Sequence, residues 1–87
     1  MLNFLLGEQR HIRVQVTSKK QQVIVITDAE YTITDRKGNL ITSGQCNING
    51  AEMSMLYIPD NPGVYTFEVT YVIPPETLKA RCDLSVT

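Results

Sequence analysis

The last third of the chain alternates apolar and polar side chains with a period of two residues. Phe67, Val69 and Tyr71 are separated by glutamate and threonine, and residues 80–86 alternate again beyond a pair of prolines. Because successive side chains of a β-strand point to opposite faces, each run places an apolar row against a core and a polar row in water. The pattern predicts an antiparallel hairpin that belongs to a β-sandwich.

Earlier segments carry weaker strand signals of the same kind. Alternating apolar residues predict strands over residues 11–17, 29–35 and 52–58. A continuous β-branched run predicts a further, covered strand over residues 23–26. Residues 40–48 predict an edge strand or a bulge, because two apolar residues are adjacent there and a glycine interrupts the run.

Turn-forming residues separate these segments. Residues 18–22 are polar and predict a turn, and Asp35–Asn39 predicts another in which Gly38 takes a positive φ. Asn49-Gly50 is the favoured pair for a two-residue hairpin loop. Residues 59–63 contain two prolines and a glycine, so they predict a loop that crosses between sheets.

About seven short strands, separated by turn signals every 8–12 residues or so and without helical periodicity, are typical of an antiparallel sandwich. At 87 residues the chain has the length of one domain, residues 1–87. We therefore expect a single all-β antiparallel sandwich, with a closed barrel as the second choice.

Pro62-Gly63-Val64-Tyr65 precedes the penultimate strand and resembles the tyrosine corner of immunoglobulin-like domains. The resemblance implies structural roles for Gly63 and Tyr65, whose hydroxyl would bond to upstream backbone. Phe67 stands where antibody domains have cysteine, and the chain has no tryptophan. The chain is therefore more similar to the reduced immunoglobulin-like modules of bacteria and their tailed phages.

The order of several features is also similar to that of small β-sandwich modules in phage tail and baseplate proteins. These features are Gly7-Glu8 before the strand at 11–17, the run Ala29–Gly38, the Pro-Gly-Val-Tyr corner and the closing hairpin. This resemblance implies a place in a phage or prophage virion, or in the host cytoplasm during assembly.

Charge and composition limit the classes of partner. The formal net charge is −1 with acids and bases interspersed, so nucleic acid and membrane surfaces are not expected partners. No run approaches the roughly 20 apolar residues of a membrane span, and the N-terminus lacks the features of a signal peptide. Protein partners remain, including further copies of the chain.

Two cysteines allow at most one disulfide. Cys82 shares the parity of the apolar row in its strand, which favours a small buried side chain. A bridge from Cys46 to Cys82 is the alternative.

Residue types that carry out catalysis are present but not in catalytic patterns. His11, the single histidine, has solvent parity and no partner near it in sequence. Asp28, Glu30 and Asp35 lack the spacing of a calcium loop, and no serine stands in a nucleophile motif. We therefore expect no enzyme activity, no metal site and no cofactor.

Apolar residues with outward parity predict an interface. If Met53, Met55 and Tyr57 face the core, Leu56 and Ile58 face outward. Together with the N-terminal apolar run they form the candidate interface, which comprises Leu2, Phe4, Leu5, Leu6, Leu56 and Ile58. The alternative for the N-terminal run is that it covers the open end of its own sandwich.

These observations favour a structural assembly module that acts through protein contacts. The alternative is an immunoglobulin-like module of the bacterial surface that holds carbohydrate or protein through its loops. A third hypothesis is a protease inhibitor that presents the loop at residues 59–63.

Overall fold

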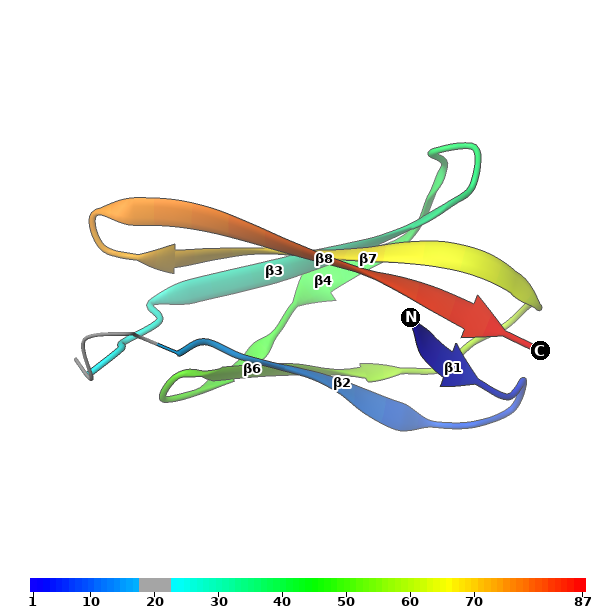
Figure 1. Cartoon of the computed structure of the whole chain (residues 1–87), viewed down its shortest axis with the longest axis horizontal. Helices are drawn as coiled ribbons and strands as arrows, with labels where there is room; N and C mark the ends of the chain where they lie inside the picture. Colours follow the sequence, from blue (N-terminus) through cyan, green and yellow to red (C-terminus); the bar gives the residue numbers. More distant parts are fainter. Residues whose placement is uncertain (18–22) are drawn as a thin grey trace.

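The computed structural model describes residues 1–17 and 23–87, which form two β-sheets (Figure 1). The strands are β1 (Leu2–Phe4), β2 (Arg10–Gln15), β3 (Asp28–Asp35), β4 (Leu40–Gln45), β5 (Asn47–Asn49), β6 (Glu52–Tyr57), β7 (Gly63–Ile73) and β8 (Glu76–Val86). The larger sheet has the order β1-β8-β7-β3-β4 and the smaller sheet the order β2-β6-β5. The all-β prediction is confirmed, with eight strands in the described residues where about seven were expected.

The predicted terminal hairpin is present. Strands β7 and β8 pair antiparallel from Gly63 opposite Val86 to Ile73 opposite Glu76, so the two prolines between them form the loop. The middle of the apolar row of β7 is buried, with Phe67 at 2% and Val69 at 0% exposed, whereas Tyr71 and Ile73 are partly buried. The polar row on the other face lies toward solvent, as the alternation predicted.

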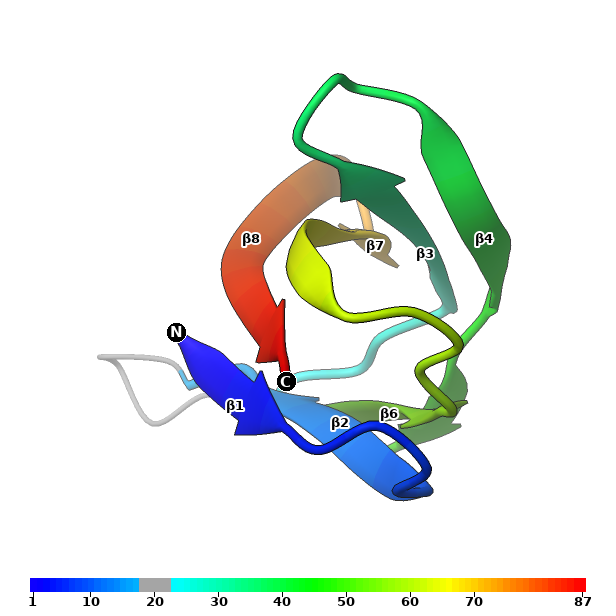
Figure 2. The same ribbon diagram turned by 90° about the vertical axis from the view of Figure 1, so that its right-hand side faces the viewer.

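The core lies between the two sheets, which curl around it (Figure 2). Its buried apolar residues are Phe4, Ile12, Ile26, Ala29, Ile33, Met53, Met55, Tyr57, Phe67, Val69, Leu84 and Val86. Both sheets contribute, and the predicted inward parity of Met53, Met55 and Tyr57 is confirmed. Burying these rows against each other is the main favourable contribution to folding.

For the segment 40–48 the predicted edge strand and bulge are confirmed, but the structure divides the segment into two strands. Strand β4 is the edge of the larger sheet, whereas β5 belongs to the smaller sheet. The chain changes sheets at Cys46, the single residue between them. The register of β3 and β4 also shifts, so that Thr34 pairs with Leu40 and Ile33 with Thr42, which leaves Ile41 as the extra residue of a β-bulge.

The hairpin loop lies one residue later than predicted. Asn49 pairs with Glu52, so the loop consists of Gly50 and Ala51 rather than of Asn49 and Gly50. A glycine at the first loop position with φ of 62° is typical of a type II′ turn. This register places Ile48 opposite Met53, which pairs two apolar side chains across the strands.

The prediction of a covered strand at residues 23–26 was wrong. These residues form no ladder and lead into β3, the first strand of the β3–β4 hairpin. Val23 is 91% exposed, while Ile26 is buried in the core. The segment crosses from the smaller sheet to the larger one, so its backbone has no neighbouring strand along its length. It makes one ladder-like hydrogen bond at its end, from Thr27 N to Val72 O. The turn predicted at 18–22 lies outside the described residues.

Cys46 and Cys82 are both free and half-buried, so the alternative of a bridge between them is not realised. Burial raises the pKa of the Cys46 thiol above its ordinary value. Cys82 pairs with Phe67 in the register of the hairpin. Of the two thiols, Cys46 packs against the core.

The outer face of the terminal hairpin carries an ion-pair network. Arg81 Nε donates to Glu68 Oε2, and Lys79 Nζ lies 3.6 Å from Glu68 Oε1. The hydrogen bond from Arg81, with the charges of Arg81 and Lys79, lowers the pKa of the Glu68 carboxyl. A carboxyl whose pKa is lower in the folded state than in the unfolded state stabilises the fold while it is ionised.

This network gives a pH-dependent prediction. The stabilisation is complete above the ordinary glutamate pKa of about 4.3, and it is lost as pH falls through the lowered pKa of the folded state. Glu68→Gln should therefore be less stable than the wild type at neutral pH and should lose less on acidification to pH about 3. Urea midpoints measured across that range test this. Arg81→Gln should reduce the acid sensitivity in the same direction, and an unchanged sensitivity in both variants would contradict the assignment.

Candidate functional site: an open edge and its cleft

The residues of the candidate interface lie in two places. Leu2, Leu5 and Leu6 are exposed near the N-terminus, and Leu56 and Ile58 are exposed at the end of β6. Only the second group lines a cleft that the described residues form. The structure therefore does not gather the six predicted residues into one cleft.

Phe4 is a correction to the predicted interface. It is 3% exposed and packs edge-on against Tyr57, with the ring centroids 5.1 Å apart. The guanidinium of Arg10 lies over the Phe4 ring, 4.3 Å from its centroid. The parity of a three-residue strand was too short a pattern to show which of its side chains is buried.

Part of the N-terminal apolar run, strand β1, packs against the rest of its own chain. Strand β1 pairs in parallel with β8, and the backbone bonds continue from Leu6 N to Thr87 O and from Thr87 N to Phe4 O. Figure 1 shows this short strand between the larger sheet and β2, near both termini. The alternative that the run closes the open end of its own sandwich therefore applies to residues 2–4.

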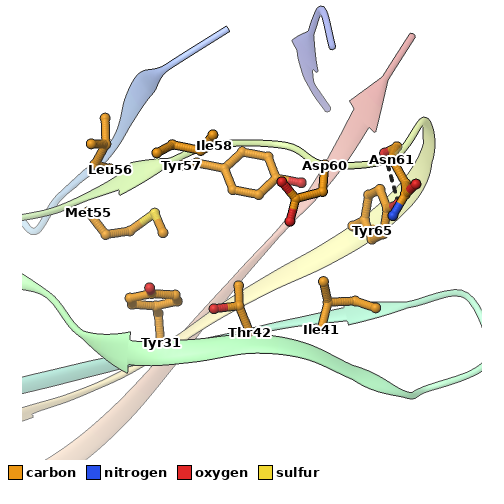
Figure 3. A pocket seen from close by; sticks show the side chains of 10 residues that line it. All are labelled: Tyr31, Ile41, Thr42, Met55, Leu56, Tyr57, Ile58, Asp60, Asn61 and Tyr65. Carbon is orange, nitrogen blue, oxygen red and sulfur yellow. Dashed lines mark hydrogen bonds between the residues drawn. The ribbon is translucent and has the colours of Figure 1, made fainter. Parts of the chain in front are cut away.

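A cleft of about 320 Å³ opens between β4 of the larger sheet and the end of β6 in the smaller sheet (Figure 3). Its lining residues are Tyr31, Ile41, Thr42, Met55, Leu56, Tyr57, Ile58, Asp60, Asn61 and Tyr65. Strand β4 is the edge of the larger sheet, so the cleft opens at the margin of the sandwich. Its volume is at the lower end of the range typical of small-ligand sites, about 300–1,000 Å³.

The β-bulge in β4 shapes one wall of this cleft. With Ile41 as the extra residue, Ile41 and Thr42 both direct their side chains toward β6 (Figure 3). Such re-aiming of a side chain is a common result of a bulge. Ile41 is nevertheless 50% exposed. The adjacency of two apolar residues in the sequence signalled the bulge, but it did not signal a cleft.

Gly44 gives the ring of Tyr31 its position on the same wall. A Cβ at Gly44 would lie 3.1 Å from Tyr31 Oη and 3.3 Å from Cζ, closer than ordinary contact. The ring of Tyr31 also stacks on Phe67, with centroids 6.0 Å apart. It is therefore held between the core and the backbone of the edge strand.

Strand β4 is an edge whose one common protection against pairing is the β-bulge at Ile41. Its six residues include no charged residue and no proline, whereas charges and prolines are common protections of natural edges. The other edges differ: β1 and β5 have three residues each, and β2 carries Arg10 and Arg13. Among the strands that the structure describes, β4 is the edge best suited to accept a further strand.

The loop between β6 and β7 closes one end of the cleft. Tyr65 Oη donates to Asn61 O at 2.9 Å, four residues upstream, so the hydroxyl fixes the loop that crosses between the sheets (Figure 3). The predicted bond from Tyr65 to upstream backbone is therefore present. Gly63 begins β7 with φ of 145°.

The electrostatics of the cleft are dominated by one carboxylate and three phenols. Asp60 and the tyrosines 31, 57 and 65 line it, and none of the lining residues is a lysine, arginine or histidine. Burial raises the pKa of Tyr57, and the charges of Tyr65 and Asp60 act in the same direction. The environment of the Tyr57 hydroxyl therefore disfavours additional negative charge.

Other sequence candidates for chemistry are dispersed. His11 is exposed on the outer face of β2, opposite Leu56, as predicted. Asp28 and Glu30 are exposed, whereas the Asp35 carboxylate accepts hydrogen bonds from the backbone N–H groups of Lys37 and Asn39 within its turn. Residues 1–17 and 23–87 contain no group of three or more potential metal-ligating side chains. No helix in these ranges is long and apolar enough for a membrane crossing.

Comparison with known proteins gives a fold likeness. A solved structure of an engineered protein, determined at 1.98 Å by the Northeast Structural Genomics Consortium, has a TM-score of 0.79 to this chain at 11% sequence identity. The match covers 99% of this chain and 18% of the engineered one, so the chain spans less than a fifth of that protein's length. At this identity the likeness supports a β-rich fold alone. No family model and no curated protein sequence matches the chain.

Proposed function

We propose that the protein is a non-catalytic assembly module that acts through protein–protein contacts, as part of a phage or prophage particle. The observation that carries the proposal is the exposed edge of β4, six uncharged residues long, beside a cleft of mixed polar and apolar lining. An edge of this kind presents unpaired N–H and C=O groups, which a strand of another chain can satisfy. The contact would then extend the larger sheet.

Apolar side chains lie along this edge. Leu40 and Ile41 of β4 are 61% and 50% exposed, which is costly to leave in water and favourable to cover. Leu56 and Ile58 carry the outward parity of β6, and Leu56 lies opposite His11, so they add apolar surface on the outer face of the smaller sheet. A partner strand along β4 would therefore gain backbone hydrogen bonds together with apolar contacts to Leu40 and Ile41.

The immunoglobulin-like class and the virion assignment rest on sequence resemblance with one structural support. The hydroxyl of Tyr65 binds the backbone of Asn61, which is how the tyrosine corner of immunoglobulin-like domains works. The order of features along the chain supports phage tail and baseplate modules. We propose both assignments on these grounds.

The second candidate is a module of the bacterial surface that holds carbohydrate or protein. One observation favours it: the cleft is lined by Tyr31, Tyr57 and Tyr65 together with Asp60 and Asn61. Aromatic rings beside polar groups are a common combination in ligand sites. A glycan array with reproducible hits, abolished by Tyr31→Ala, would favour this candidate over assembly.

Sedimentation velocity over a concentration series tests the assembly proposal. The wild type should show a mass that rises with concentration, and Ile41→Lys should weaken this association at least about tenfold, because the charge would be placed within the contact. Val23→Lys is the matched control, since Val23 is exposed, apolar and outside β4. A mass that stays monomeric at every concentration, or equal effects of the two variants, would contradict the proposal.

A further inference from the structure

Tyr57 is a buried residue whose polar group has no partner within the described residues. It is 5% exposed and its ring points into the cleft from β6 (Figure 3). None of the hydrogen bonds within residues 1–17 and 23–87 involves its hydroxyl. Every fully buried side-chain oxygen in these ranges has a hydrogen-bond partner, so the Tyr57 oxygen is not fully buried and is accessible from the cleft. A polar group held in this position requires a partner from outside, either water or a ligand.

Asp60 supplies a negative charge at the same place. Its side chain lies beside the end of the Tyr57 ring in Figure 3, and its charge contributes to the raised pKa of Tyr57. The three ion pairs of the described residues involve Glu8 and Glu68 but not Asp60. The cleft therefore presents a carboxylate that is not neutralised by any cation of its own lining.

The remaining walls suit the apolar stem and the charged end of a long side chain. Ile41 and Met55 offer apolar surface, and the Tyr31 ring offers a π-face between the two sheets. Cations are attracted to such faces, and lysine and arginine bury their methylene stems along apolar surface while the head group stays with polar partners. Asp60 disfavours an anion, whereas a cation gains an ion pair with its carboxylate, which a neutral ligand does not.

We propose that this cleft binds the lysine or arginine side chain of a partner polypeptide, with the head group beside Asp60 and Tyr57. The inference deepens the proposed assembly function and rests on it, since a strand that pairs with β4 directs every second side chain toward the cleft. The Asp60 carboxylate and the Tyr57 oxygen accept hydrogen bonds from the cation. The stem then lies between Ile41 and Met55.

Amide chemical shifts of the intact chain test this with defined probes. N-acetyl-lysine methylamide and N-acetyl-arginine methylamide should produce saturable shifts at Thr42, Tyr57 and Asp60. N-acetyl-norleucine methylamide has a similar stem without the charge. We expect it to bind at least about tenfold more weakly, because it lacks the charge-assisted hydrogen bond to Asp60. Added salt should weaken the lysine probe and leave the norleucine probe unchanged.

Two variants separate the roles of the polar groups. Asp60→Asn should weaken the lysine probe about tenfold, and Tyr57→Phe should weaken it by a smaller factor. Asp28→Asn is the matched control, because Asp28 is an exposed carboxylate at the start of β3 that does not line the cleft. Unchanged melting temperatures of the variants would show that the losses concern binding rather than folding.

The opposing outcomes are distinct. Equal binding of the norleucine and lysine probes would show an apolar groove without charge selection, and it would overturn the inference. So would the absence of saturable shifts at the solubility limit of the probes, or displacement of the lysine probe by neutral sugars. Self-association that responds to Ile41→Lys would remain evidence for the assembly function in each of these cases.

Discussion

Replacing Phe67 by alanine should lower the free energy of unfolding by about 3–5 kcal/mol, the range for removing a large aromatic side chain from a core. Phe67 is 2% exposed and stacks on Tyr31, so the ring is enclosed by β7 itself and by the neighbouring strand β3. The loss combines the transfer of the ring to water with the cavity that it leaves. Domains of this size are stable by only about 5–15 kcal/mol in total, so the variant should be close to unfolding.

Urea or guanidinium denaturation with linear extrapolation measures this change, and an unaltered slope would show that the unfolded state is the same. Thr70→Ala on the outer face of β7 is the matched control and should cost less than about 1 kcal/mol. If the alanine variant does not fold, Phe67→Leu can be measured instead, because leucine keeps part of the apolar contact and should give a smaller loss of stability. A cost below about 1 kcal/mol for Phe67→Ala would contradict the position assigned to this ring.

The terminal hairpin was predictable from sequence because each of its faces is uniform over many residues. Strand β7 spans eleven residues, and the alternation at Phe67 and Val69 repeats often enough to fix both the face and the partner. A one-residue slip would turn the whole apolar row into water. In long strands with one buried face, the apolar pattern therefore determines the pairing register.

Short elements lacked this redundancy. The three residues of β1 and of β5 contain too few alternations to show which side chains are buried, so Phe4 was assigned to the surface although it is in the core. The β-branched run at 23–26 has high strand propensity, but no neighbouring strand is available to it along its length. A segment of high strand propensity forms a strand only where a neighbouring strand is available to pair with it.

The cleft was not predictable because it depends on tertiary placement. Its walls come from β3, β4, β6, β7 and the crossing loop, and the residues span about two fifths of the chain, from Tyr31 to Tyr65. The sequence placed Leu56 and Ile58 on the outward face correctly. It did not indicate that a cleft would open between β4 and β6, or that Asp60 would lie next to Tyr57.

Gly63→Ala should lower the free energy of unfolding by about 2 kcal/mol, because only glycine adopts its backbone conformation readily. Its φ is 145°, and a Cβ built there lies 3.5 Å from Tyr65 Oη, which is ordinary van der Waals contact. The penalty is therefore expected from the backbone and not from a clash. Gly38→Asn is the matched control: its φ is 83° in open space, where asparagine is tolerated, and it should cost less than about 1 kcal/mol.

A double-mutant cycle with Tyr65→Phe decides how the alanine acts. Removing the hydroxyl should cost about 1 kcal/mol through the lost bond to Asn61 O. If the strain stays within the backbone at Gly63, the two costs add, and the corner remains formed in the alanine variant. If the alanine instead displaces the ring of Tyr65, the hydroxyl has already lost its bond and its removal costs nothing further. Additive costs with intact corner contacts are the expected result, since the crossing loop must keep its position for the cleft to form.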